Sequence, residues 1–373
     1  MDESLDALMN VHKRESVLSS FSAVFDFMGT TLKVTLADAH TLNLFSAYVS
    51  PYFAMRQPEG KSPVRYTVKV NTAAIPAELE RLTHDFAARA ETMPWYFGAT
   101  MQVLRVGDFR LARAADAGWM LFNASSVIVW CISDEVSALL LTVRLSREVM
   151  IAFSEHELLR IHGGFISFEQ SGCLVLGGAG AGKTSLLINS LRHGGSSFCA
   201  NDRSLVYLDG NRLTAHGSPI QSQVGEFHLH EIAELNLPAN QKYSRPSGEI
   251  GFWSKMLPFK KASLSPRLLA RLFDSPMRSH GRIDAVVIPR LRPEVDTAVS
   301  IEEIHHDKRT LLLDQVLNED TAFPSSIFDL TAKPLPEPVI SALCQRPWYF
   351  LNGYFNDGAV ASVLENTIRR QPL

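Results

Sequence analysis

Cysteine is scarce in this chain, and its scarcity excludes the commonest kind of structural metal site. Four cysteines occur in 373 residues, and no two of them form a CxxC pair. A zinc site built from paired thiolates therefore does not fit. Most of the four lie in apolar runs, where a free thiol packs as a small hydrophobic group. We expect buried, reduced cysteines and a cytoplasmic protein; the cysteines are Cys131, Cys173, Cys199 and Cys344.

The chain also lacks a long apolar run and an excess of one charge. Its longest apolar stretch, residues 119–143, is interrupted by Asn123, two serines, Asp134 and Glu135, which makes it too polar to cross a bilayer. The N-terminus, MDESLDALMN, has no basic region followed by an apolar core, so it does not resemble a secretory signal. The net charge is -3. We expect neither nucleic acid nor a membrane as a partner.

The length of 373 residues and a hydrophobic content of 46% favour two globular domains. Short apolar runs separated by turn residues predict an N-terminal α+β domain over residues 1–150. We place its strands near 22–28, 31–37, 65–71, 101–107, 109–115, 118–124 and 126–132, and its helices near 40–53 and 77–91. A boundary between about 145 and 162 leads to a C-terminal domain over 151–373.

A glycine-rich loop opens the C-terminal domain. The stretch CLVLGGAGAGKTSLLINSLRHGG, residues 173–195, has an apolar strand before the loop and a helical pattern after it. Residues 177–184 fit the pattern GxxxxGK[ST], which cradles nucleotide phosphates. We expect the helix to run from Thr184 to His193 and to stop at Gly194 and Gly195.

Each part of the loop suits a triphosphate. Glycines let consecutive backbone N–H groups converge on phosphate oxygens, and the following helix adds the positive end of its dipole. Lys183 supplies a mobile cation for the β- and γ-phosphates, and Thr184 a hydroxyl for Mg²⁺. The predicted ATP-binding residues are Gly177, Gly178, Ala179, Gly180, Ala181, Gly182, Lys183, Thr184 and Ser185.

An acidic residue follows on the next expected strand. The run SFCAN leads into Asp202, nineteen positions after Lys183. A carboxylate at the end of the neighbouring strand can hold Mg²⁺ opposite Thr184. The run SLVYLDGNRLTAHG then predicts a hairpin that turns at residues 209–211. Further on, Arg290 and Arg292 follow the strand IDAVVIP, where guanidinium groups could stabilise charge on the γ-phosphate or bind an acceptor.

These motifs together resemble the HPr kinase/phosphorylase family and its related kinases, whose core is shared with phosphoenolpyruvate carboxykinase. The similar segments are HGGFISFE, GGAGAGKT, FCANDRSLVYL and RIDAVVIPRLRPEVDTAVSIEEI, with a C-terminal helix, aromatic strand and helix. The resemblance covers about 158–373, and its specific motifs lie between 162 and 208. The first 150 residues do not resemble the N-terminal domain of the bacterial HPr enzyme, which favours a relative with a different acceptor.

The resemblance implies an α/β P-loop fold of the HPr kinase/phosphoenolpyruvate carboxykinase type for the C-terminal domain. It also implies that His162 touches the transferring phosphate, although a histidine hydrogen-bonded at a strand start explains the position equally well. The family has two aspartates where this chain has Asn201 and Asp202. An amide cannot accept a proton from an attacking hydroxyl, so Asp202 alone, or another group, must serve.

Two functions follow from the sequence. The first is an ATP- and Mg²⁺-dependent kinase that phosphorylates a hydroxyl on a small protein, a peptide or a small molecule, with Lys183, Asp202, His162, Arg290 and Arg292 as catalytic residues. The second is a nucleotide-sensing regulatory module without phosphoryl transfer, which the amide of Asn201 keeps open. The resemblance further implies a possible homo-oligomer.

Overall fold

The computed structural model divides the chain into two compact units. Unit 1 comprises Met1–Ser46, Phe53–Glu155 and Thr321–Pro334, and unit 2 comprises Ala47–Tyr52, His156–Asp320 and Leu335–Leu373. The structure describes residues 3–18, 20–56, 63–83, 86–95, 99–115, 117–131, 134–169, 171–178, 180–193, 195–229, 243–245, 247–254, 261–292, 298–317, 325–328, 333–354 and 358–369. The main division lies at Glu155, within the expected interval, but two short segments belong to the unit opposite to the one that the sequence suggested.

Unit 1 is built on a sheet with the strand order β3-β1-β2-β4-β9-β8-β7-β6-β5. Strand β4 pairs in parallel with β2 and β9, and the other neighbours are antiparallel. The strands are β1 (Phe21–Phe27), β2 (Thr30–Leu36), β3 (Ala54–Met55), β4 (Tyr66–Asn71), β5 (Glu91–Pro94), β6 (Thr100–Val106), β7 (Phe109–Ala114), β8 (Gly118–Phe122) and β9 (Ser126–Trp130). The sheet is therefore mixed and mostly antiparallel.

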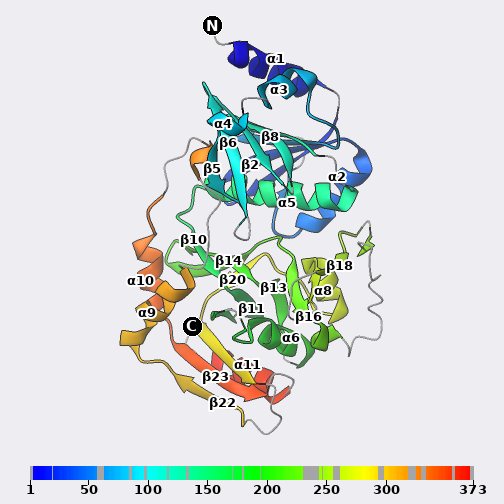
Figure 1. Cartoon of the computed structure of the whole chain (residues 1–373). Helices are drawn as coiled ribbons and strands as arrows, with labels where there is room; N and C mark the ends of the chain where they lie inside the picture. Colours follow the sequence, from blue (N-terminus) through cyan, green and yellow to red (C-terminus); the bar gives the residue numbers. More distant parts are fainter. Residues whose placement is uncertain are drawn as a thin grey trace. The chain divides into compact units, whose positions relative to one another are not determined.

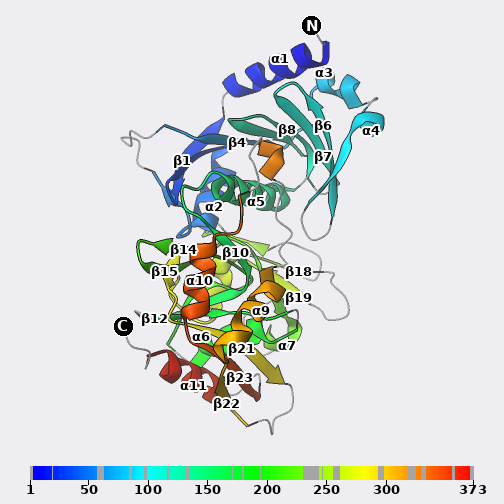
Figure 2. The same cartoon turned by 90° about the vertical axis from the view of Figure 1, so that its left-hand side faces the viewer.

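Helices cover both faces of this sheet, as Figures 1 and 2 show for α1 (Glu3–Val17) and α5 (Glu135–Ala152). Leu8 and Val11 of α1 pack with Ile128 and Trp130 of β9 in one core cluster. Asp134 caps α5 by accepting a hydrogen bond from the Ser137 backbone N–H at 2.9 Å. The remaining helical segments of unit 1 are α2 (Ala39–Val49), α3 (Ala77–Glu80), η1 (Arg81–Thr83), α4 (Phe86–Arg89) and η3 (Ser325–Phe328).

The expected helix over 77–91 is wrong as a single element. The chain forms α3, η1 and α4 there, residues 84–85 lie outside the described residues, and Glu91 begins the edge strand β5. Strand pairing explains the early end, because Glu91 pairs with Val103 of β6. Glu91, the last residue of the predicted helix, therefore belongs to the edge strand of the sheet instead.

Unit 2 has at its centre a sheet with the order β13-β11-β12-β21-β23-β22. Strands β12, β21 and β23 run parallel, and β11 and β22 run antiparallel to their neighbours. The strands are β11 (Gly164–Phe168), β12 (Ser171–Val175), β13 (Ser197–Ala200), β21 (Ala285–Arg292), β22 (Ser300–Glu303) and β23 (Trp348–Tyr354). Both faces are buried: Cys173 and Val175 of β12 point into one core cluster, and Leu174 into the other.

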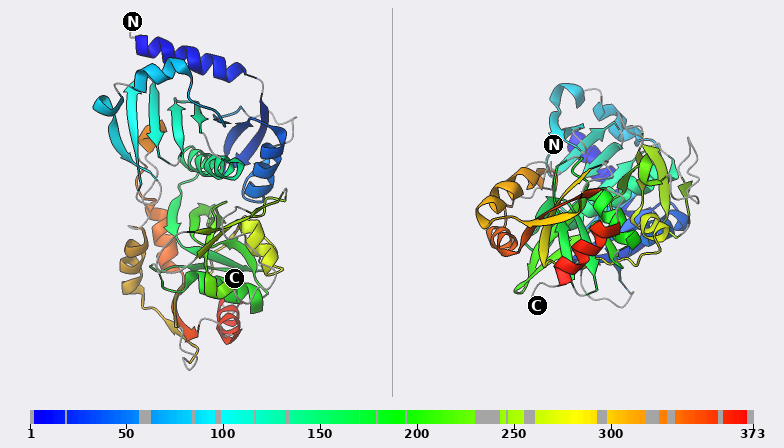
Figure 3. Two further views of the ribbon diagram at one scale, coloured as in Figure 1. Left: turned by 45° about the vertical axis from the view of Figure 1, so that its right-hand side comes forward. Right: turned by 90° about the horizontal axis from the view of Figure 1, so that it is seen from below.

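The first of these clusters lies under α6 (Lys183–His193), α8 (Pro266–Leu272) and α11 (Gly358–Arg369), and the second under α9 (His306–Leu317) and α10 (Glu337–Gln345). Figure 3 shows α11 as the red helix near the C-terminal end of the chain. A second sheet, β10-β14-β15-β20, adds β10 (Leu159–His162), β14 (Arg203–Asp209), β15 (Arg212–Gly217) and β20 (His280–Arg282). A third, β16-β19-β18-β17, contains Ser222–Gly225, Lys261–Leu264, Ile250–Ser254 and Tyr243–Ser244, with α7 (Glu226–Leu229) after β16.

Several local expectations for this unit are confirmed. Strand β12, the glycine loop and α6 follow one another, the hairpin β14–β15 turns at Gly210 and Asn211, and the chain ends with α10, β23 and α11. All four cysteines are buried free thiols. Burial raises the pKa of Cys199 to about 12, so this thiol stays protonated.

Candidate functional site

One edge of the central sheet of unit 2 gathers the residues that the sequence singled out. Gly164, which starts β11, pairs with Val175 at the end of β12, and Phe165 pairs with Ala200 at the end of β13. The amino end of β11 therefore meets the carboxyl ends of its two neighbours. His162, the glycine loop and Asp202 leave the strands at this same edge, which is where open α/β sheets bind their ligands.

The glycine loop needs its glycines for conformation and for space. Gly177, Gly180 and Gly182 have φ values of 139°, 80° and 98°, which side chains rarely adopt. A Cβ on Gly182 would also lie 3.1 Å from the Cβ of Leu291 on β21. Ala179 lies outside the described residues. The loop turns directly into α6, whose first bond runs from the Leu186 N–H to the Gly182 carbonyl at 2.8 Å.

Lys183 lies over the loop that precedes it. Its Nζ donates to the carbonyl oxygens of Gly177 and Gly178, the second at 3.1 Å. Thr184 is partly exposed, whereas the Ser185 hydroxyl is buried and hydrogen-bonds to His228 Nε2 at 2.9 Å. The Ser185 side chain is thus engaged inside the unit, whereas free backbone N–H groups in the first turn of a helix can bind an anion.

Asp202 is held by groups on two strands. His162 Nε2 donates to Asp202 Oδ1 at 3.1 Å, and Arg203 Nε lies 3.5 Å from Oδ2. His162 and Arg203 face each other in the β10–β14 pairing, which places Asp202 between them. Burial alone would raise the pKa of Asp202. The hydrogen bond from His162 and the charges of His162, Arg203 and Lys183 lower the pKa by more than burial raises it, so the net shift is downward. With 32% of its side chain exposed, the ionised carboxylate stays accessible to a ligand.

Asn201, which stands where the similar family has an aspartate, is buried. It is 6% exposed, and its Oδ1 has no hydrogen-bond partner in the part of the chain that the structure describes. A buried amide oxygen without a partner costs free energy, about 1–3 kcal/mol in typical proteins. The buried Asn201 Oδ1 therefore lacks a hydrogen-bond donor among the described residues, and a donor from a ligand or a water molecule would satisfy it.

Arg290 and Arg292 are exposed at the carboxyl end of β21. The Arg290 guanidinium stacks over the Phe350 ring of β23, 3.3 Å from its centroid, which fixes the charge in place. Both arginines line a pocket of about 670 Å³ that also includes the glycine loop. This volume lies within the roughly 300–1,000 Å³ of ordinary small-ligand sites.

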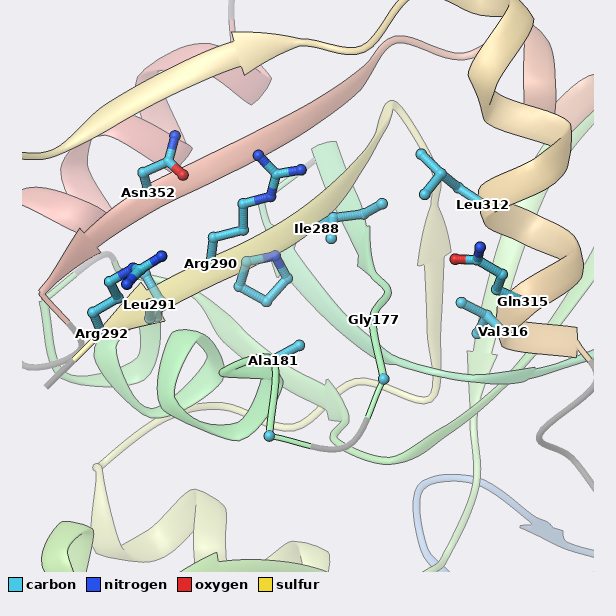
Figure 4. Close-up of a pocket in the computed structure, with 13 residues that line it drawn as sticks. Gly177, Ala181, Ile288, Arg290, Leu291, Arg292, Leu312, Gln315, Val316 and Asn352 are labelled. Carbon is cyan, nitrogen blue, oxygen red and sulfur yellow. The ribbon is translucent and has the colours of Figure 1, made fainter.

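Figure 4 shows how the pocket is built. The glycine loop forms one wall and the end of β21 another, while α9 and β23 supply residues that the sequence reasoning missed. Six of the predicted site residues lie at this sheet edge but are not among the described lining residues of the pocket: His162, Gly182, Lys183, Thr184, Ser185 and Asp202. The lining residues are Gly177, Gly178, Gly180, Ala181, Ile288, Pro289, Arg290, Leu291, Arg292, Leu312, Gln315, Val316 and Asn352.

No protein-family model matches the chain, and no curated protein matches it in sequence. Across the described ranges no three His, Cys, Asp or Glu side chains gather as a metal site. Within the same ranges no helix is both long and apolar enough to span a membrane. The geometry of unit 2 is therefore what bears on function.

Proposed function

We propose that this protein is an ATP-dependent kinase that transfers the γ-phosphate to a hydroxyl group, and that unit 2 is a P-loop catalytic domain related to HPr kinase and phosphoenolpyruvate carboxykinase. The observation that carries the proposal is the pocket that joins the glycine loop to Arg290 and Arg292. The backbone of the glycine loop and two guanidiniums line this pocket, and backbone N–H groups and guanidiniums are the donors that a polyphosphate requires.

The loop residues and Lys183 would hold the phosphates. Lys183 exchanges its two carbonyl contacts, with Gly177 and Gly178, for phosphate oxygens when a nucleotide enters. Arg290 and Arg292 then neutralise charge on the γ-phosphate in the transition state, which is the main catalytic requirement of phosphoryl transfer.

Mg²⁺ would be held by Thr184 and Asp202. A hydroxyl and a low-pKa carboxylate are hard oxygen ligands of the kind that Mg²⁺ prefers, and both side chains are at least partly exposed. When bound with ATP, the metal neutralises phosphate charge. Asp202 also orients the acceptor hydroxyl and takes its proton, while His162 keeps the carboxylate in position through Nε2.

The acceptor in this proposal is a small protein, a peptide or a small-molecule alcohol in the cytoplasm, and unit 1 selects it. Unit 1 holds an extensive sheet with helices on both faces, which is more structure than nucleotide binding needs. Assembly into a homo-oligomer is part of the same proposal.

A second function is favoured by one observation. Asn201 replaces a carboxylate with an amide that cannot act as a base, and its Oδ1 is buried without a described partner. A nucleotide-sensing module would use the same pocket to bind ATP and would change partner affinity without transferring phosphate.

The experiment that tests these functions is transfer of label from γ-labelled ATP with Mg²⁺. The full chain is presented with the small proteins and peptides encoded beside its gene, and Lys183→Ala is the matched control. Label that appears on one acceptor and is lost in the control supports the kinase. Tight ATP binding with no label on any acceptor contradicts the kinase and supports the sensor.

A further inference from the structure

The pocket has two chemically different ends. Arg290, Arg292 and Asn352 lie at one end, and Leu312, Gln315 and Val316 of α9 lie at the other, with the glycine loop along the wall between them (Figure 4). The two ends therefore suit different parts of one ligand. Guanidiniums and backbone N–H groups bind polyphosphate. Apolar walls with a few polar groups at suitable positions bind a flat aromatic ring.

The apolar end begins at the loop itself. A Cβ on Gly177, the first loop glycine, would lie 3.9 Å from Ile288 Cγ2, so the isoleucine side chain borders the point where the loop leaves β12. Val316 belongs to a buried core cluster of the unit, and the partly buried side chains of Ile288 and Leu312 pack against that cluster. Because the wall continues the core, its side chains hold their positions without a ligand.

Hydrogen bonds of Arg309 hold helix α9 in position next to this apolar wall. The buried side chain of Arg309 donates to three carbonyl oxygens, those of Ile304 at 3.1 Å, Cys344 at 3.1 Å and Arg346 at 2.7 Å. Leu312 and Val316 follow Arg309 by one and two helical turns, so they share a face of α9. Gln315 is exposed beside them and presents its amide at the rim of the apolar end.

We propose that this apolar end is the base subsite of the nucleotide, that Gln315 reads the base, and that the subsite prefers adenine. The assignment rests on the nucleotide-binding function proposed above and deepens it. The Gln315 amide carries a donor and an acceptor side by side, which matches the amino group and neighbouring ring nitrogen of adenine. Ile288, Leu312 and Val316 pack against the faces and edges of the ring.

We expect discrimination against guanine because hydrogen-bond donors of guanine would lack acceptors in this subsite. Guanine adds a ring N–H and an exocyclic amino group, and both are donors that need acceptors. None of the described lining residues is acidic, so no carboxylate is present among them to accept both of these donors. Burying an unpaired donor is costly, and the loss falls on GTP rather than on ATP.

The test measures equilibrium binding of ATP, GTP and inorganic tripolyphosphate to the full chain with Mg²⁺. Tripolyphosphate has no base, so it reports the phosphate end alone. Gln315→Leu and Gln315→Glu are the variants, and Asp314→Asn, an exposed neighbour on α9 that does not line the pocket, is the matched control. Because Gln315 is exposed, neither variant removes core packing.

We expect Gln315→Leu to weaken ATP binding by about 5- to 10-fold, the loss typical of one or two hydrogen bonds, with tripolyphosphate unchanged. Gln315→Glu offers only acceptors, so it should move the ATP-to-GTP affinity ratio toward GTP by roughly 10-fold or more. Asp314→Asn should leave all three affinities within about 2-fold.

Unchanged ATP affinity in both variants, or an equal loss for ATP and tripolyphosphate, would overturn the base subsite while leaving the phosphate-binding function in place. Wild-type protein that binds neither ATP nor tripolyphosphate would overturn the nucleotide function, and the base subsite with it. The two failures are thus distinguishable.

Discussion

At the scale of single residues, Asp202 carries the chemical step of the proposed reaction. His162 donates to one carboxylate oxygen and Arg203 lies beside the other, so the side chain is both oriented and ionised. We predict that Asp202→Asn, which keeps the shape but removes the base, lowers phosphate transfer by about 100-fold or more. ATP affinity should change much less, because the loop and the arginines hold the phosphates. Label transfer and equilibrium binding measure the two effects separately.

Asp209→Asn is the control for this variant, since Asp209 is an exposed carboxylate at the far end of β14, the strand that begins directly after Asp202. It should leave transfer unchanged. Because the pKa of Asp202 is lowered, the wild-type rate should also show no loss from protonation of this carboxyl as the pH falls from 7 to 5. Equal transfer by Asp202→Asn and wild type would remove Asp202 from the mechanism.

A second residue-scale prediction concerns His216, a buried imidazole in unit 2. Burial lowers its pKa to about 4 from the ordinary 6.5, with His280 stacked against it adding to the shift. The Nδ1 atom donates to the Gly217 carbonyl at 2.6 Å. Because the pKa of His216 is lower in the folded state than in the unfolded state, protonation of His216 favours unfolding. The contribution of neutral His216 to the free energy of unfolding is therefore fully present above pH 6.5 and is lost as the pH falls toward 4, by about 3 kcal/mol for a shift of this size.

Chemical denaturation at pH 7 and pH 4 of wild type and His216→Asn measures this contribution. The asparagine amide can still donate to the Gly217 carbonyl but does not titrate. Acid should therefore destabilise the variant less than wild type, whereas His280→Asn, at an exposed position, should retain most of the acid loss. An identical acid loss in His216→Asn and wild type would show that this histidine is not held neutral.

Local spacing was enough to predict the glycine loop and the neighbouring Asp202, but not the residues that complete the pocket. The residues GGAGAGKT lie consecutively, and Asp202 follows the end of a neighbouring strand at the same sheet edge, so sequence order approximates spatial order there. Gln315 and Asn352 lie more than 130 positions after the loop and reach it only through α9 and β23. A single glutamine on an exposed helix face carries no periodic signal that would mark it.

At the scale of elements, α9 depends on the three carbonyl contacts of Arg309. We predict that Arg309→Ala lowers the free energy of unfolding by about 2–3 kcal/mol, because buried carbonyl oxygens lose their donor. ATP affinity should fall as well, since α9 presents Leu312 and Gln315 to the pocket, while tripolyphosphate affinity should fall less. Denaturant unfolding and equilibrium binding provide the two measurements.

Lys308→Ala is the matched control, because Lys308 is an exposed cation one position earlier on the same helix. It should change the free energy of unfolding by less than about 0.5 kcal/mol. If Arg309→Ala behaved like Lys308→Ala, the position of α9 would have to depend on its apolar contacts alone.

Helices and strands were predicted correctly where the sequence marks both the start and the end of the element. Strand β12, the loop and α6 form a strand, a glycine run and a helix within 23 residues, and they are found as expected. The segment 77–91 has helical spacing but no such limits, and its last residue joins β6 at the sheet edge. The contact of His162 with Asp202 arises from the antiparallel pairing of β10 with β14 across forty positions, which spacing alone does not reveal.

At the scale of the whole molecule, the chain exchanges short segments between its units, and no composition shift marks them. Ala47–Tyr52 belongs to unit 2, where the Tyr52 hydroxyl donates to the Cys199 carbonyl at 2.7 Å across 147 positions. A single cut near residue 155 would therefore remove part of the core of unit 2. Such long-range contacts depend on tertiary packing, which sequence patterns do not reveal.

The proposed nucleotide would raise the stability of unit 2 when it binds. A ligand that binds only the folded state stabilises it by mass action, by about 2.7 kcal/mol at a concentration of 100 Kd. For a unit of this size that corresponds to a rise of roughly 5–10 °C in Tm. We predict that Mg-ATP slows hydrogen exchange of the buried amides in α6, β21 and β23 and raises the transition of unit 2 by this amount. Lys183→Ala should show little of either effect at the same ATP concentration. Equal stabilisation of the variant and wild type would mean that ATP binds away from the glycine loop, because Lys183 lies directly over Gly177 and Gly178.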